Sequence, residues 1–226
     1  MTIAAVYDAR YGCGDMAHFA RLPALHSAAR DWSEISWFSP DHGQALATLP
    51  SLHAPVYVES FLSGELPLSQ SNYLTWSPAL RDGVIAMLDG QLTATRLALE
   101  RGIAFNLAIG FHHAHPERGG GYCTFNGLAL VALRHPDIRI TVLDSDEHGS
   151  DGTEAFCALL PNLNNISLFG TRFGVRGGKR SQVLQIPRGE SARAGFRTAV
   201  DQAMELITMD PPDLLIFQAG ADSHES

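Results

Sequence analysis

The stretch Ile138-Arg-Ile-Thr-Val-Leu143 is a short, apolar and β-branched run, and Asp144-Ser-Asp-Glu-His148 follows it directly. A run of this length and composition predicts a buried β-strand. Two more apolar runs also lead into polar sequence: 104–109 into Gly110-Phe-His-His-Ala-His115, and 214–218 into Ala219-Gly-Ala-Asp222. Ligand sites in open α/β sheets gather at the carboxyl ends of the strands. We therefore expect these three ends to converge on one rim and to form a metal site there.

Helical patterns separate the predicted strands. Residues 78–101 carry apolar side chains at helical spacing, with Pro78 suited to the first turn and Gly102 to the stop. Another helix is predicted over 126–134, and two more strands over 3–7 and 165–169. Strands that alternate with helices indicate an α/β fold with a mostly parallel sheet. Since no domain boundary stands out, we expect a single domain over residues 1–226.

Composition and charge exclude several classes of function. The 226 residues include 16 basic and 24 acidic side chains, for a formal net charge of −8. Phosphate neutralisation needs a basic surface, so we expect no binding to nucleic acid. The amino-terminal residues do not resemble a signal peptide, and no run is long enough to span a bilayer. Three widely spaced cysteines form no disulfide framework, which indicates a reducing compartment, the cytoplasm.

The segment after the 138–143 strand has the composition of a cation site. On an extended chain Asp144, Asp146 and His148 share one face, because alternate side chains point the same way. Two carboxylates and an imidazole suit zinc, and Fe(II) or Mn(II) is not excluded. A solvated acidic strand end with an exposed histidine is an equally good interpretation of this motif alone.

Two neighbouring segments carry further polar groups. His112 and His113 fit poorly in an apolar core and would serve as general base and acid, although a hydrogen-bonded surface pair is the simpler interpretation. The glycines at 119–121 lack the Lys-Ser/Thr of a phosphate-binding loop, which excludes that function. Asp222 follows small residues that permit close backbone approach, but it is also compatible with an ordinary turn.

Taken together, these motifs resemble the histone deacetylase and acetylpolyamine amidohydrolase superfamily. The resemblance rests on four ordered segments: His112-His-Ala114, Gly119-Gly-Gly-Tyr-Cys-Thr-Phe-Asn126, Asp144-x-Asp-x-His148 with Asp151-Gly-Thr153, and Gln218-Ala-Gly-Ala-Asp222. Trp76-Ser-Pro78 and Asn106-Leu107 are most similar to the short bacterial members and the class IV enzymes. The resemblance implies an arginase–deacetylase type of α/β fold, with helices on both faces of the sheet.

The resemblance also implies a role for each matching residue. Asp146, His148 and Asp222 match the zinc ligands. His113 matches the general base and His112 its partner, an electrostatic stabiliser or acid. Asp144 and Asp151 match the acids that orient these imidazoles, Asp144 for His112 and Asp151 for His113. Gly121 and Tyr122 match the wall of the acyl channel, and the Asp144 region with Ser167-Leu168 matches a potassium site.

The implied reaction is zinc-dependent hydrolysis of an acyl-amide, with acyl-lysine, acetylpolyamine or a similar small N-acyl amine as the substrate. An arginase-like enzyme with two manganese ions is less favoured, because it needs more bridging carboxylates than the sequence offers. The family places a tyrosine well beyond the third ligand, whereas this sequence stops four residues after Asp222. We therefore expect a chain that is incomplete at its C-terminus, and a catalytically impaired metal- or partner-binding protein is the alternative function. The loop at 69–77 contains no acidic residue. Family members that bind peptides commonly have an acid in this loop, which holds the backbone of the substrate.

Overall fold

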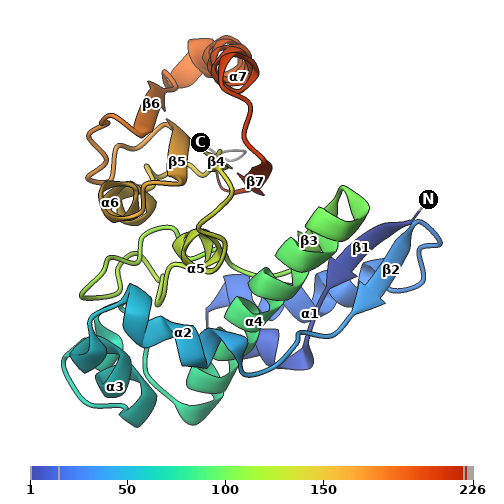
Figure 1. Cartoon of the computed structure of the whole chain (residues 1–226), viewed down its shortest axis with the longest axis vertical. Coiled ribbons are helices and arrows are strands. Elements are labelled where there is room, and N and C mark those ends of the chain that lie inside the picture. Colours follow the sequence, from blue (N-terminus) through green and yellow to red (C-terminus); the bar gives the residue numbers. More distant parts are fainter. Residues whose placement is uncertain (1, 15, 221, 223–226) are drawn as a thin grey trace. The chain divides into compact units, whose positions relative to one another are not determined.

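A computed structural model of the chain describes residues 2–14, 16–220 and 222 (Figure 1). The chain divides into two compact units, Met1–Val131 and Ala132–Ser226. Each unit contains its own parallel sheet with helices around it, as expected for an α/β protein. The prediction that residues 1–226 form a single domain stays a prediction.

The first unit is built on three parallel strands in the order β2-β1-β3. These strands are β1 (Ile3–Val6), β2 (Ile35–Phe38) and β3 (Ala104–Asn106). The helices are α1 (Ala17–Ala29), α2 (Gln44–Leu52), α3 (Pro55–Ser63) and α4 (Pro78–Arg101), with short 3-10 turns η1 (Ala9–Gly12) and η2 (Leu68–Gln70). Helix α4 packs its buried Ala94 and Leu97 against Ala4 and Val6 of β1.

The predicted bounds of α4 are confirmed. The Ser77 hydroxyl accepts a hydrogen bond from the backbone N–H of Leu80 at 3.0 Å, so it caps the N-terminus. Pro78 occupies the first turn, and Gly102 takes φ +91° immediately after the last residue. A positive φ at this position favours glycine, which explains why the helix ends there.

A buried carboxylate of α4 caps the N-terminus of α2. Asp89 is 2% exposed, and its two oxygens accept from the backbone N–H groups of Gly43 at 2.9 Å and Ala45 at 2.8 Å. Gly43 itself provides no side-chain cap. Asp89 therefore satisfies two amides that would otherwise lack partners at the helix start, and its charge complements the helix dipole.

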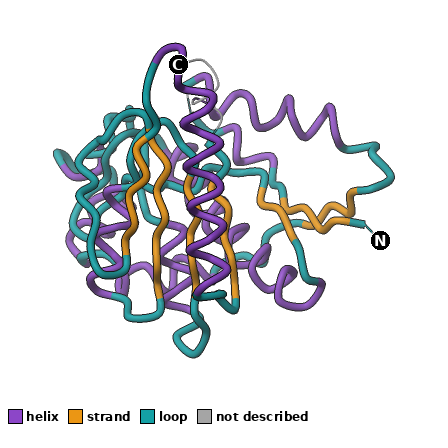
Figure 2. The backbone as a smooth tube through the Cα atoms, turned by 90° about the horizontal axis from the view of Figure 1, so that it is seen from above, coloured by secondary structure: helices purple, strands orange, loops and turns teal. Residues whose placement is uncertain are grey.

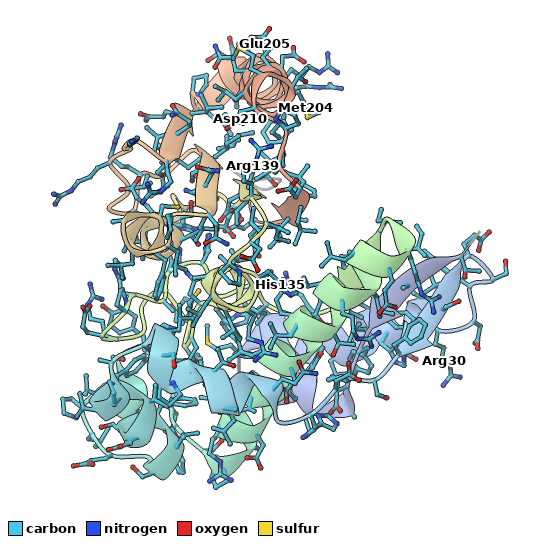
Figure 3. The ribbon with its side chains drawn as sticks, viewed as in Figure 1. Arg30, His135, Arg139, Met204, Glu205 and Asp210 are labelled. Carbon is cyan, nitrogen blue, oxygen red and sulfur yellow. The ribbon has the colours of Figure 1, made fainter. Side chains whose placement is uncertain are left out.

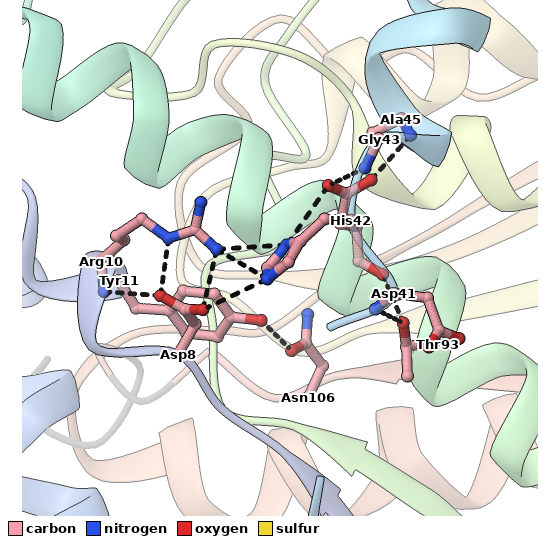
Figure 4. Close-up of polar contacts among 10 residues, drawn as sticks. Asp8, Arg10, Tyr11, Asp41, His42, Gly43, Ala45, Thr93 and Asn106 are labelled. Carbon is pink, nitrogen blue, oxygen red and sulfur yellow. Dashed lines mark hydrogen bonds and ion pairs between the residues drawn. The ribbon is translucent and has the colours of Figure 1, made fainter. Parts of the chain in front are cut away.

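The ion pair between Arg10 and Asp8 is more exposed than Asp89. Arg10 donates to Asp8 through Nε and Nη2, both at 2.8 Å, and its Nη2 lies 3.0 Å from Nε2 of His42 (Figure 4). Hydrogen bonding from Arg10 lowers the pKa of the Asp8 carboxyl. The Arg10 side chain is 45% exposed, so this pair contributes little to stability compared with the buried cap of Asp89.

Asp89→Ala is expected to destabilise the first unit by about 3 kcal/mol, because it removes two buried hydrogen bonds to a charged acceptor. Urea unfolding followed by circular dichroism measures this loss. Asp82→Ala is the matched control, since Asp82 is an exposed aspartate of the same helix, and it should change stability by less than about 0.5 kcal/mol. Equal stabilities of the two variants would contradict the capping role.

The second unit contains four parallel strands in the order β6-β5-β4-β7. They are β4 (Ile140–Asp144), β5 (Leu163–Phe169), β6 (Ser181–Gln185) and β7 (Leu214–Gln218). The helices are α6 (Asp151–Leu159) and α7 (Ala192–Met209), with the short turn η3 (Gly189–Ser191), and α5 (Gly127–Arg134) spans the boundary between the units. Figure 2 shows α7 as the long helix in front of the strands of this sheet, running roughly along them.

The central strand β5 is covered on both faces. Ile166 and Leu168 pack with Ala199 and Ala203 of α7 in one apolar cluster. On the other face, the Ser167 hydroxyl accepts from the N–H of Ser150 at the start of α6. The expectation of helices on both faces of a parallel sheet is thus confirmed for this sheet.

Arg139 joins the beginning of β4 to the segment that enters β7. Its Nη1 donates to the Asp210 carboxylate at 2.6 Å and its Nη2 to the Pro211 carbonyl at 2.7 Å (Figure 3). The backbone N–H of Arg139 also donates to Asp213 at 2.8 Å. These contacts help to align the two strands, which places Asp144 opposite Gln218 at their carboxyl ends.

The three predicted strand ends lie in two sheets, and their convergence on one rim stays a prediction. The ends of β4 and β7 lie side by side as predicted, but β3 pairs with β1 in the sheet of the other unit. The strand ends at Asn106 rather than Ile109. The N–H of Leu107 makes the last bond to β1, at the carbonyl of Val6, and the N–H of Ala108 then donates to the carbonyl of Asn106 in a turn. Strand pairing therefore brings two of the three expected ends to one edge. Within the described residues, no helix is both long and apolar enough to cross a membrane.

Candidate metal centre and histidine pair

Three of the predicted ligands converge at the carboxyl ends of β4 and β7. Asp146 and His148 follow β4, and Asp222 follows β7. Nδ1 of His148 lies 3.2 Å from Oδ1 of Asp146 and 3.2 Å from Oδ2 of Asp222. One ligand atom from each residue falls within 4.8 Å of the others. All three belong to the second unit, so the sheet register alone brings them together.

This donor set fits a divalent metal ion. Ligand atoms at about 2.0–2.2 Å from a tetrahedral zinc ion lie about 3.3–3.6 Å from one another. The 3.2 Å separations from the His148 nitrogen are close to that spacing. Two carboxylates and one imidazole are also the ligand types that zinc and Fe(II) accept.

Backbone amides hold both carboxylates in place. Oδ1 of Asp146 accepts from the N–H of His148 at 2.9 Å, and Oδ1 of Asp222 accepts from the N–H of Glu147 at 3.0 Å. Asp144, which is fully buried, accepts from the N–H of Asp146 at 3.0 Å. The segment 144–148 is thus folded by its own side chains, and the β7 end is attached to it through Asp222.

Gly220 allows the two strand ends to approach. A Cβ atom at this position would lie 2.5 Å from Cα and 2.7 Å from Oδ2 of Asp146. These separations are too short for any side chain, so the position requires glycine. The sequence signal was present, since the small residues before Asp222 predicted a close backbone approach.

Gly220→Ala is expected to weaken zinc binding about tenfold or more, because the added methyl group displaces Asp146. Changes to residues that hold a metal ligand in place typically reduce metal affinity by about 10–100-fold. Competition with a fluorescent chelator measures the Kd. Gly178→Ala is the matched control, since a Cβ there meets nothing within 4 Å. Zinc affinity equal to that of the control would show that the strand ends tolerate the methyl group.

Phe173 and the segment around it adjoin His148, one of the predicted ligands. His148 forms an isolated parallel bridge with Thr171, and its ring lies edge-on to the ring of Phe173 at 5.6 Å. Phe173 has φ +44° and is 41% exposed. Gly149 packs against the carbonyl of Arg172, where a Cβ would lie at 2.4 Å. No motif in the sequence marks Phe173, because its position beside His148 depends on the fold.

Residues 174–180, Gly-Val-Arg-Gly-Gly-Lys-Arg, form a basic glycine-rich loop that is held by a carboxylate of α6. Glu154 accepts from the backbone N–H groups of Arg176 and Gly177, each at 2.8 Å, and from the hydroxyl of Ser181 at 2.8 Å. The backbone amides of Arg176 and Gly177 in this loop are therefore already hydrogen-bonded within the protein. The side chains of Arg176 and Lys179 remain exposed.

The histidine pair belongs to the first unit. His112 and His113 are each 5% exposed, and their rings lie 3.9 Å apart. Gly121 packs directly on His113, because a Cβ there would lie 2.5 Å from the ring carbon Cδ2. Tyr122 takes φ +64° with its side chain 46% exposed, and its N–H donates to the carbonyl of Asn72. The predicted Gly121 and Tyr122 therefore lie in the same segment as His113.

A buried histidine braces both ends of this segment. The Nδ1–H of His53 donates to the carbonyl of His115 at 2.9 Å, and Nε2 accepts from the N–H of Asn126 at 3.1 Å. This arrangement fixes the neutral form, and burial lowers the pKa of His53 to about 4. Protonation of Nε2 would place its N–H against the backbone N–H of Asn126, and the hydrogen bond between the two groups would be lost.

Stability should therefore fall as the pH decreases from about 6.5 toward 4. The unfolded chain binds a proton at His53 in this range and the folded chain does not, so the brace is fully effective above the unfolded pKa. The full contribution is about 3 kcal/mol. Urea unfolding of the EDTA-treated protein should show a shallower pH dependence in His53→Gln than in His42→Gln, a half-exposed control. Parallel curves for the two variants would reject this assignment.

The remaining predicted residues divide between the units. His112, His113, Gly121 and Tyr122 lie in the first, whereas Asp144 and Asp151 join the three ligands in the second. Asp151 is the first residue of α6. The pairing of Asp144 with His112 and of Asp151 with His113 stays a prediction, as does the potassium site, although Asp144 and Ser167 are buried register partners in the sheet.

Comparisons with known proteins agree on one family. The histone deacetylase domain matches residues 20–226. An uncharacterized protein of the cyanobacterium Picosynechococcus is 30% identical over 79% of this chain and 62% of its own length. Histone deacetylase 2 of Arabidopsis thaliana is 30% identical over 59% of this chain and 36% of its own, so the chain spans less than two thirds of these relatives.

Two comparisons involve enzymes of Burkholderia pseudomallei. An acetylpolyamine amidohydrolase is 25% identical over 97% of this chain and 66% of its own length. The crystal structure of an acetylpolyamine aminohydrolase superimposes with a TM-score of 0.80, at 19% identity, over 98% of this chain and 82% of that one. This structural likeness confirms the predicted arginase–deacetylase type of fold.

Proposed function

The chain belongs to the histone deacetylase domain family, and from this membership we propose that it is a metal-dependent amidohydrolase. The observation that supports the proposal best is the convergence of Asp146, His148 and Asp222, with ligand atoms within 4.8 Å. The proposed reaction cleaves an acyl-amide and releases a carboxylate and a free amine.

The three ligands would hold zinc, with Fe(II) as the alternative. The ion supplies Lewis acidity to the scissile carbonyl. Because two carboxylates cancel most of its charge, the attacking water needs a nearby base. His113 takes that proton, while His112 stabilises developing charge. Asp144 and Asp151 orient the two imidazoles and fix which nitrogen carries a proton.

The proposed substrates are small N-acyl amines, either acetyl-lysine or an acetylated polyamine. Relatives named for both chemistries, a histone deacetylase and an acetylpolyamine amidohydrolase, support this class. The half-exposed Tyr122 beside His113 offers an aromatic wall for an acyl group. We also propose a cytoplasmic location, because none of the three cysteines, all within the described residues, forms a disulfide bond.

A metal-loaded sample tests the proposal. Zinc-reconstituted protein is assayed on a fluorogenic acetyl-lysine peptide and on an acetylated diamine, with Asp146→Asn as the ligand-deficient control. Turnover that requires both zinc and Asp146 is the expected result. Stoichiometric zinc binding without turnover of either substrate would favour a metal- or partner-binding protein, and arginine hydrolysis with manganese would favour the arginase-like alternative.

A further inference from the structure

A cavity of about 730 Å³ lies in the second unit and is lined by residues from the end of β5 and the first turns of α7. Its lining includes Glu147, Ile186, Arg188, Arg193, Phe196 and Arg197. The volume falls within the range of small-molecule sites, about 300–1,000 Å³. None of the metal ligands lines this cavity, although Glu147 lies between two of them in the sequence.

Three arginines and two glutamates, Glu147 and Glu190, line the cavity, so its lining carries a net charge of +1 (three minus two) in a chain whose net charge is −8. Arg188 is already bound, since its Nη2 lies 3.2 Å from the Glu147 carboxylate and 2.5 Å from the Thr171 hydroxyl. Arg193 and Arg197 make no hydrogen bond or ion pair with any residue that the structure describes. They are four residues apart on α7, so they share one face of the helix.

The inner surface of the cavity is apolar. Ile186 is 8% exposed and belongs to the cluster formed by β5 and α7. Phe196 packs against the same cluster and stands between Arg193 and Arg197 in the sequence. The cavity lining thus combines an apolar surface with two guanidinium groups that bind no described residue. This combination is complementary to a molecule with both an apolar part and an anionic part.

We propose that this cavity binds an amphipathic anion: a carboxylate or phosphate head group attached to an apolar body. Arg193 and Arg197 bind the head, because planar guanidinium groups match the oxygens of carboxylates and phosphates. The apolar body lies on Phe196 and Ile186. Glu147 keeps Arg188 occupied, so the head group binds at the α7 side of the cavity.

Calorimetric titration of the EDTA-treated full chain tests the proposal, since removal of metal excludes binding of anions to the metal ligands. The probes are octyl phosphate and octanoate below their micelle concentrations, with 1-octanol and inorganic phosphate as controls. The charge-reversal variant is Arg193→Glu with Arg197→Glu, and Arg193→Gln with Arg197→Gln replaces it if circular dichroism shows misfolding. Arg176→Glu in the basic loop is the matched control.

At least one of the two amphipathic anions should bind more tightly than 1-octanol and inorganic phosphate. Its Kd should rise about tenfold or more in the double variant and stay unchanged in Arg176→Glu. The tighter of octyl phosphate and octanoate identifies the head group. Unchanged binding in the double variant, or equal binding of 1-octanol or inorganic phosphate, would overturn the proposal.

Discussion

Asp222→Ala and His148→Ala are each expected to abolish stoichiometric zinc binding. Nδ1 of His148 lies 3.2 Å from a carboxylate oxygen of both Asp146 and Asp222, so each residue contributes one corner of a compact donor set. Loss of an outer-shell partner costs about 10–100-fold in metal affinity, and loss of a ligand should cost more. After dialysis against buffer with micromolar free zinc, elemental analysis should find about one ion per wild-type chain and almost none per variant chain.

Asp201→Ala is the matched control for this measurement, because Asp201 is an exposed aspartate on α7 of the same unit. It should bind as much zinc as the wild-type protein. Thermal unfolding with and without zinc supplies a second readout, since an ion that binds only the folded state raises Tm. Unchanged stoichiometry in both ligand variants would reject the assignment of the metal centre.

The sequence predicted the candidate site best where the positions of side chains follow from the regular geometry of an extended backbone. The period of two along an extended chain predicted that Asp146 and His148 share a face, and the pairing of β4 with β7 brings Asp222 to them. The apolar runs that predicted β1, β4, β5 and β7 correspond to strands within about two residues of the expected bounds. Local periodicity and parallel register therefore account for the convergence of the three predicted ligands.

Features that depend on distant contacts were not predictable. Asp89 in the middle of α4 gives no sequence signal for capping α2, since the cap depends on how two helices pack. The strand β2 was not predicted either, because Ile35–Phe38 is only four residues long and half-buried throughout. The cavity beside α7 likewise joins Glu147 and Gly170 to residues 186–197, which no local pattern connects.

His113→Ala is expected to reduce kcat of the metal-loaded protein by about a hundredfold or more, the usual scale of general-base catalysis. This follows from the proposed function, in which His113 takes the proton of the attacking water. The ring is buried and held in place by Gly121, which leaves it little freedom to turn. His112→Ala should cost less, because the proposed role of His112 is secondary.

The matched control is His135→Ala, a half-buried histidine of the second unit that is not one of the predicted site residues (Figure 3). Zinc content should stay at the wild-type level in all three variants, which separates a loss of proton transfer from a loss of metal. Exogenous imidazole should partly restore turnover in His113→Ala, because it supplies the missing base and the substitution leaves space beside the side-chain-free Gly121. A structural role alone would not respond to imidazole, and full activity of His113→Ala would exclude His113 as the base.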